Sequence, residues 1–432
     1  MKPIIQRNLT LACVVALASA CGPAAVTTPA ASPARPAAGT GSPSTAIAPS
    51  TSNAAGALTI GVVVPFTESA VDNAFGVAQQ HAADLYLKLH GGTIAGRDAK
   101  LVYSDESVSA SLDLVKATQL VEQEHADVLL GLIGNEGAYA VRQYADSRHI
   151  VFIDTNASGN ALTRNVPGCT PSCLSRDLFR SSYSSWQLSE PLGEWAAQHG
   201  ATTFDVVAAD DTFGSESAQA FIDGLARHGG SATTKTAVPL GARWETIVAA
   251  IAAQPTKHVY AAFVGPAAAG FLTAWGQARL TEKGYSLYGP GPLTELDVLR
   301  QVKAVAVGVT TASIWSSALD NQANRTLVTA FAQAYQDETG APLVADSHVV
   351  QMWDAMTALD LALQATNGSP ATDGLIAALE AVAFKSPRGD FSFDKVTHNV
   401  VQDIYIQVVR ASGGSFANAV VGTIPKVSDP GR

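Results

Sequence analysis

Apolar residues in the first half of the globular sequence alternate between two spacings. The segment Leu58–Val64 is a continuous, largely β-branched run, typical of a strand buried on both faces of a parallel sheet. Segment 77–89 has apolar residues three and four positions apart, which predicts an amphipathic helix. We expect further strands at 100–103, 127–132 and 150–153, and helices around 114–121 and at 137–146. Strand and helix units joined by short turns predict a parallel, doubly wound sheet.

The same alternation restarts after residue 173. Strands are expected at 204–209, 259–263, 305–313, 390–393 and 404–409, and helices at 190–198, 217–227, 325–338, 347–365 and 373–382. The second set of units predicts a second sheet. About 375 residues follow position 57, a length that suits two domains better than one simple core. The fold class is therefore predicted as α/β, with two doubly wound parallel-sheet lobes.

The first 57 residues lack the strand and helix patterns of the rest of the chain and differ from it in composition. Residues 1–20 combine a short basic start, an apolar run too short to span a bilayer and small residues before Cys21, which is the order of an export signal. The cleavage region looks like a bacterial lipobox, so we expect lipidation of Cys21. An ordinary signal peptide cut after Ala20 is the alternative. Residues 21–57 are almost wholly Ala, Pro, Ser, Thr and Gly, which predicts a disordered tether.

The charge and hydropathy of the chain indicate whether it interacts with nucleic acid or with a membrane. The chain has 37 acidic and 27 basic residues, and the basic residues are scattered, so we expect no nucleic-acid partner. Beyond the tether, no apolar run approaches the roughly 20 residues of a membrane span. These features predict an extracytoplasmic location, with the membrane reached through the lipid on Cys21.

Two cysteines remain in the globular part, Cys169 and Cys173. In an oxidising compartment they are expected to form a disulfide across a small loop. A metal pair and a redox pair are the alternatives. No second ligand cluster accompanies these cysteines, and their spacing is not Cys-x-x-Cys.

Motifs of catalysis are missing from the sequence. It contains no phosphate-binding Gly-x-x-x-x-Gly-Lys-Ser/Thr loop, no His-Glu-x-x-His and no Gly-x-Ser-x-Gly elbow. We therefore expect no catalytic residues, no metal and no organic cofactor. A nucleophile and a base brought together only by the fold would leave an exported hydrolase as an alternative.

Seven groups of residues carry a resemblance to a known family. They are Ile60–Pro65; Gly91–Arg97 with Leu101–Asp105; Leu120–Glu122 with Asp127–Gly131; Ile150–Ser158 with Leu162 and Thr163; Asp211–Gly214; Trp353–Ala355; and Phe384–Asp394 with His398. In this order, behind an export signal, the sequence resembles the branched-chain amino acid-type (Leu/Ile/Val-binding-like) solute-binding proteins of ABC importers. Those proteins have the periplasmic binding protein type I fold. The resemblance covers about 58–409.

The resemblance implies two lobes joined by three hinge crossings, near 179–183, 304–313 and 384–391. The first lobe would comprise 58–180 and 312–384. The second would comprise 181–311 and 385–412, which leaves 413–432 as a C-terminal tail.

The resemblance also places a ligand between the lobes, at the carboxyl ends of the strands. The first lobe would contribute Phe66, Thr67, Asn135, Glu136, Asn156, Ala157 and Ser158. The second lobe would contribute Phe213, Val264, Gly265, Gly291 and Glu295. Each of these residues has a structural alternative, such as a helix cap, a turn or core packing.

One position departs from the amino acid-binding relatives. Gly291 stands where those relatives present an acid to the ligand ammonium, and Glu295 follows four residues later. The expected function is capture of a small amino acid-like, amide or aromatic carboxylate solute by lobe closure, with permease and ATPase subunits as partners. A ligand-sensing subunit for a membrane receptor is the alternative.

Overall fold

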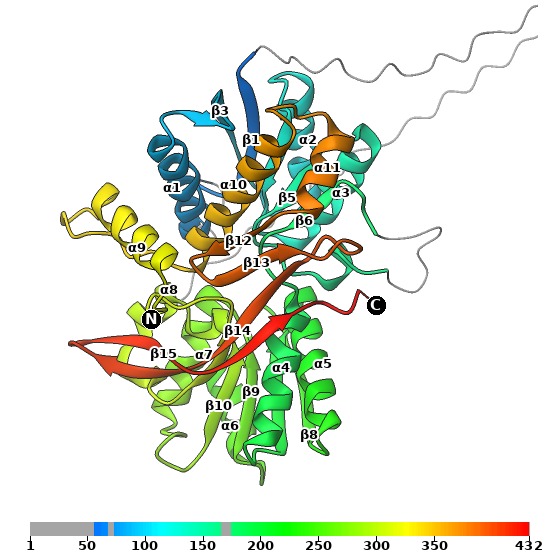
Figure 1. Ribbon diagram of the computed structural model, residues 1–432. Coiled ribbons are helices and arrows are strands. Elements are labelled where there is room, and N and C mark those ends of the chain that lie inside the picture. The colour runs from blue at the N-terminus through cyan, green and yellow to red at the C-terminus, as the bar shows by residue number, and fades with distance from the viewer. Residues whose placement is uncertain (1–55, 68–72, 166–173, 432) are drawn as a thin grey trace, which may run out of the picture. The chain divides into compact units, whose positions relative to one another are not determined.

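The computed structural model describes residues 56–67, 73–165 and 174–431. Cys21 and the pair Cys169 and Cys173 lie outside these residues, as do the predicted signal and almost all of the predicted tether. Two β-sheets with helices packed against them make up the described part (Figure 1).

The first sheet contains six strands in the order β2-β3-β1-β4-β5-β6. Their bounds are β1 Leu58–Val64, β2 Thr93–Ile94, β3 Arg97–Asp105, β4 Val128–Gly131, β5 Phe152–Asp154 and β6 Leu178–Arg180. All neighbours are parallel except β2 and β3. Six of the seven residues of β1 are buried, as its continuous apolar run predicts.

Six helices belong with this sheet, which we call the first lobe. They are α1 Asn73–Leu89, α2 Ala110–Glu122, α3 Asn135–Arg148, α9 Gln322–Ala334, α10 Ser347–Ala365 and α11 Thr372–Glu380. Helix α10 packs along α1, although more than 250 residues separate them in sequence (Figure 1). Late helices therefore complete the first lobe.

The second sheet has nine strands, in the order β12-β13-β14-β11-β10-β9-β7-β8, with β15 paired to β14. Their bounds are β7 Thr203–Ala209, β8 Ser231–Val238, β9 His258–Ala262, β10 Ser286–Pro290, β11 Thr310–Ser313, β12 Ala383–Ser386, β13 Gly389–Phe393, β14 Val400–Ser412 and β15 Ser415–Val427. Strands β7 to β11 are parallel, and β12 to β15 extend the sheet with antiparallel pairs.

The helices of this second lobe are α4 Ser185–Gln198, α5 Thr212–Arg227, α6 Trp244–Ala252, α7 Gly265–Gln277 and α8 Leu296–Val302. Two 3₁₀ turns of the second lobe are η2 Gly291–Thr294 and η3 Lys303–Ala306. A further 3₁₀ turn, η1 Asn160–Leu162, follows β5 of the first lobe. Ser184 begins α4 with a capping box, in which its hydroxyl accepts from the Gln187 amide and the Gln187 side chain accepts from the Ser184 amide.

The chain passes between the two sheets three times, as the resemblance implies. It leaves the first sheet between β6 and α4, returns between β11 and α9, and leaves again between α11 and β12. The first and third crossings lie near the expected positions. The second was expected at 304–313 but lies at 314–321, because Thr310–Ser313 is a strand of the second sheet.

The expectation that 413–432 is a tail is wrong. Strand β15 fills most of this segment and pairs with β14 along nearly its whole length. The two-residue turn between them is Gly413-Gly414, and both residues have positive φ (55° and 85°), as a tight hairpin turn requires.

In the described part of the chain, no helix combines the length and apolar character needed to cross a bilayer.

Candidate functional site

The carboxyl ends of parallel strands are where an open α/β sheet offers its loops to a ligand. In the first lobe, Phe66 and Thr67 follow β1, Asn135 and Glu136 begin α3 after β4, and Asn156, Ala157 and Ser158 follow β5. The structure therefore places all seven residues predicted for this lobe at one edge of one sheet.

Asp105, the last residue of β3, holds the loop after β1. Its carboxylate accepts the Phe66 amide hydrogen at 2.6 Å, and it also accepts from the amide and hydroxyl of Thr67. Burial acts against the charged form, but these hydrogen bonds and Lys116 hold the pKa of Asp105 below its usual range. The Thr67 hydroxyl is thus committed to Asp105 and positions the loop.

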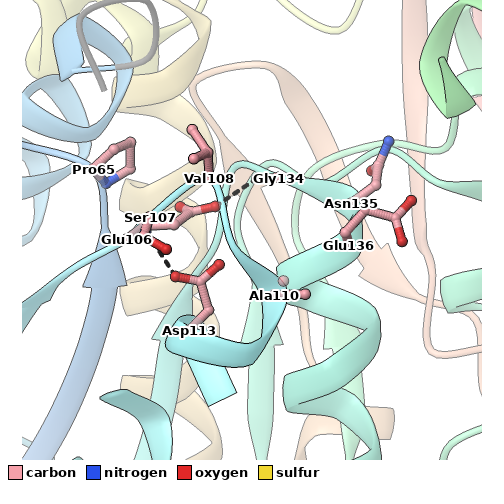
Figure 2. Close-up of a pocket in the computed structure, with 10 residues that line it drawn as sticks. Pro65, Glu106, Ser107, Val108, Ala110, Asp113, Gly134, Asn135 and Glu136 are labelled. Atoms are coloured by element: carbon pink, nitrogen blue, oxygen red, sulfur yellow. Dashed lines mark hydrogen bonds between the residues drawn. The ribbon is translucent and has the colours of Figure 1, made fainter. Parts of the chain in front are cut away.

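Asn135 and Glu136 line a pocket of about 150 Å³ beside α2 and α3 (Figure 2). The Glu106 carboxylate accepts from the amides of Ile133 and Gly134 at 2.8 and 2.7 Å, and so holds the segment that leads into α3. Asp113 accepts from the Ser107 amide at 2.7 Å. Three carboxylates surround this small pocket, which makes it unsuitable for a carboxylate ligand.

The loop after β5 is the most polar part of the edge. Asp154 is fully buried, accepts from the Ala157 amide at 3.0 Å and accepts from the Ser182 hydroxyl at 2.8 Å. Burial raises the pKa of Asp154 to about 7, although Arg180 and Ser182 act in the opposite direction. Ser158 is also buried, and its hydroxyl lies 3.2 Å from that of Ser185.

Asn156 differs from its neighbours in this loop. Its side-chain oxygen is buried and has no hydrogen-bond partner among the residues that the structure describes. A buried amide oxygen without a hydrogen bond is costly, which makes this oxygen a candidate acceptor for a donor group on a ligand.

Arg180, at the end of β6, fixes the shape of this loop. Its guanidinium is fully buried and donates to the carbonyls of Ser158, Gly159 and Tyr183 at 3.3, 2.6 and 3.0 Å. Since Tyr183 lies in the first crossing, Arg180 ties the loop after β5 to the hinge.

The second lobe places its predicted residues at the corresponding edge of its own sheet. Phe213 lies in the first turn of α5 after β7 and is 8% exposed, while Val264 and Gly265 begin α7 after β9. Asp211 caps α5 by accepting from the Gly214 amide at 2.7 Å.

Gly291 and Glu295 follow β10, at the same edge of the second sheet as Phe213 and Val264. A Cβ added at Gly291 would lie 3.0 Å from both side-chain atoms of Ser313, so there is little room for an acid at this position. The Glu295 carboxylate instead accepts from the Ser347 hydroxyl at 2.7 Å. Burial raises the pKa of Glu295, with nearby His348 opposing that shift.

Several polar contacts join the facing edges of the two lobes. Ser347 donates to Glu295, and the Ser185 hydroxyl lies against that of Ser158. The Asn160 amide donates to Glu216 at 2.8 Å, and the Thr212 hydroxyl donates to Glu136 at 3.4 Å. Of the predicted residues, Glu136, Ser158 and Glu295 take part directly in these contacts.

Five residues that make these contacts were not predicted from the sequence: Asn160, Ser185, Thr212, Glu216 and Ser347. Glu216 lies in the first turn and a half of α5, three residues after Phe213, so its position on that helix was a usable signal. Ser347 is brought to Glu295 by α10, from a remote part of the sequence. No local pattern indicates that meeting.

Among the described residues, no group of three or more His, Cys, Asp or Glu side chains is arranged to hold a metal ion.

Several known proteins are similar to this chain. The sequence profile of the family described as "Periplasmic binding protein" matches residues 57–415. The "Leu/Ile/Val-binding protein homolog 6" of Brucella melitensis is 25% identical over 352 residues, which is 81% of this chain and 87% of the relative.

Two solved structures illustrate the similarity in space. A solute-binding protein of an ABC transporter from Rhodopseudomonas palustris, in complex with benzoate, is 28% identical, with a TM-score of 0.77 over 87% of this chain and 99% of the other. Another, from R. palustris BisB5 in complex with 3,4-dihydroxybenzoic acid, is 24% identical, with a TM-score of 0.79 over the same shares.

Proposed function

Because the chain belongs to the periplasmic binding protein family, we propose that it captures an aromatic carboxylate between its two lobes and presents it to a membrane importer. The family predicted from the sequence and the two-sheet α/β fold are both confirmed. The chain is a solute-binding protein of the kind that serves ABC transporters. Permease and ATPase subunits are the partners that such a role requires.

The observation that carries the proposal is the unsatisfied Asn156 oxygen at the facing strand ends. This oxygen is an acceptor, so it suits the hydroxyl group of a hydroxylated aromatic carboxylate such as 4-hydroxybenzoate. It lies in a loop that Asp154 and Arg180 hold rigidly, so its amide is fixed before a ligand arrives. Preorganised polar groups add affinity because little ordering entropy is lost on binding. The contacts between the lobes supply the second half of the enclosure.

The second lobe favours an acid over an α-amino acid. An α-amino acid carries an ammonium group, which needs an ionised carboxylate near it. Gly291 cannot supply one. Glu295 is engaged by Ser347 and Glu216 by the Asn160 amide, and burial raises the pKa of both carboxyl groups. A carboxyl group that tends to stay neutral is a better partner for a neutral hydroxyl than for an ammonium group. Phe66 and Phe213 offer apolar surface for a ring. The benzoate complex of the relative at 28% identity supports this choice.

A thermal-shift series tests the proposal. A ligand that binds only the native state raises its melting temperature, so benzoate and 4-hydroxybenzoate are expected to raise it and leucine is not. Asn156→Ala should weaken 4-hydroxybenzoate binding about tenfold or more, since the hydrogen bond that the ligand hydroxyl donates to the Asn156 oxygen is lost. Gln143→Ala removes an exposed amide from α3 and serves as the control. A shift with leucine and none with either benzoate would contradict the proposal.

We further propose that the lipid on Cys21 holds the mature protein at the membrane and that catalysis forms no part of its role. Cys21→Ser should move the protein from the membrane fraction to the soluble fraction after cell lysis. An unchanged distribution would indicate an ordinary signal peptide.

A further inference from the structure

A cavity of about 580 Å³ lies under the β14–β15 hairpin, beside α8. Its other walls are the segment that follows β11 and residues 344–346, which precede α10. The cavity shares Gly291 and Glu295 with the strand-end residues described above. Asn156, Ser158 and Phe213 do not line it.

The size and lining of this cavity suit a small organic molecule. Sites for such ligands have volumes of roughly 300 to 1,000 Å³ and mostly apolar walls. Leu299, Trp315 and Phe416 contribute apolar surface here. The Trp315 indole N–H donates to the Asn324 side chain at 2.8 Å, so the ring is held in place without a ligand.

The basic and acidic side chains that line the cavity differ in how many hydrogen bonds and ion pairs they form. Arg300 and Lys303 are exposed, and neither forms an ion pair or a side-chain hydrogen bond within the described residues. On the opposite wall, Asp346 accepts from the amides of His348 and Val349 at 3.0 and 3.1 Å. Asp346 also lies 3.6 Å from the His348 ring nitrogen. The acids are therefore partnered and the cations are not, which favours an anion at the cationic rim.

Lys303 also has an unusual backbone. Its φ and ψ are 52° and −125°, a combination that residues other than glycine rarely adopt. Strained positions of this kind are concentrated at functional sites. Here the strain turns the chain from α8 into η3, at the position where Lys303 joins the cavity wall.

We infer that this cavity is a second solute site, separate from the strand-end site. It takes a small organic anion with an apolar body, whose carboxylate lies at Arg300 and Lys303 and whose body contacts Trp315 and Leu299.

Trp315 provides a local reporter for the test. Its indole N–H resonance, assigned by comparison with Trp315→Phe, is followed by NMR while benzoate is titrated into the millimolar range. The wild-type protein should show a saturable shift of this resonance. Arg300→Ala with Lys303→Ala should weaken the binding that causes the shift by roughly fivefold to tenfold. Ala417→Trp, which fills the cavity without a change in charge, should abolish it.

The control variant is Lys283→Ala with Lys395→Ala, which removes two exposed cations that do not line the cavity. It should bind as the wild type does. Asn156→Ala should leave the Trp315 titration unchanged, which separates this site from the strand-end site. The inference is wrong if Trp315 shows no saturable shift, if the Arg300 and Lys303 variant binds like the control, or if Asn156→Ala alone removes the shift.

Discussion

Single residues at the strand ends carry out two different tasks. Asp105, Glu106 and Arg180 use their charges to hold loops through hydrogen bonds with backbone groups, although the Nε atom of Arg180 has no partner among the described residues. Asn156 keeps a polar atom without a partner in the described part of the chain. This division is what a binding edge needs, because a ligand can be recognised only by groups that are fixed but not already used.

The buried Asp154 makes the stability of the protein depend on pH. Its pKa rises from 3.8 to about 7 on folding, so between these values the folded protein keeps a proton that the unfolded chain has released. Stability attributable to this group should therefore fall as the pH rises from about 4 to about 7 and level off above that range. Asp154→Asn should flatten this part of the profile. Urea unfolding at a series of pH values measures the free energy of unfolding. If it falls with pH equally steeply in the wild type and in Asp154→Asn, Asp154 is not the group responsible.

At the scale of elements, α4 and α5 pack so closely that only glycine fits between them. A Cβ added at Gly224 would lie 2.1 Å from the Glu190 carbonyl oxygen, and one at Gly193 would lie 2.3 Å from that of Phe221. Gly224→Ala should therefore lower the free energy of unfolding by about 1 to 3 kcal/mol, because the helices must move apart.

Gly374 in α11 is a matched control for that substitution. A Cβ there would meet its nearest neighbour, Thr366, at 3.8 Å, which is an ordinary contact. Gly374→Ala should be neutral or stabilise the protein by up to about 1 kcal/mol, from helix propensity alone. Denaturant titrations measure the free energy of unfolding of both variants. If the two substitutions change it equally, the claim that α4 and α5 leave no room for a side chain at Gly224 is contradicted.

Sequence patterns predicted most of the parallel strands and their helices, because buried strands and amphipathic helices have distinct apolar spacing. Strand β15 was missed. Its pattern alternates only weakly, since most of its residues are partly or fully exposed. The helices α6, α7 and α8 were also not predicted. The Gly413-Gly414 turn signal was present and would have identified the hairpin.

The candidate site was predictable only in part, for a related reason. Residues that follow a strand, such as Asn156 and Phe213, can be placed from strand order alone. Contacts such as Ser347 with Glu295 depend on how a late helix returns to the first lobe, which no local pattern encodes. Whether the predicted residues bind a ligand stays a prediction.

At the scale of the whole molecule, the turn between β12 and β13 contacts two of the crossings. Arg388, in this turn, donates to the carbonyls of Ser181 and Ser182 in the first crossing and pairs with Asp354 of α10 at 2.7 Å. Its neighbour Pro387 accepts from the Asn321 side chain, in the second crossing, at 3.0 Å. These contacts tie the first two crossings to the turn that follows the third.

Removing Arg388 should be costly. Arg388→Met would leave the fully buried Asp354 without its cation, so the free energy of unfolding should fall by about 3 to 5 kcal/mol. Adding Asp354→Leu should restore part of the loss, because the uncompensated charge is then gone. Urea unfolding of both variants measures this. If Arg388→Met alone lowers the free energy of unfolding by less than about 1 kcal/mol, the proposed role of Arg388 is contradicted.

Isothermal titration calorimetry of the mature protein with 4-hydroxybenzoate, and separately with leucine, tests the central claim most directly. Capture of an aromatic carboxylate between the lobes predicts saturable binding of 4-hydroxybenzoate that is weakened by Asn156→Ala, and no saturable heat with leucine. Saturable binding of leucine with none of 4-hydroxybenzoate, or 4-hydroxybenzoate binding that Asn156→Ala leaves untouched, would contradict it.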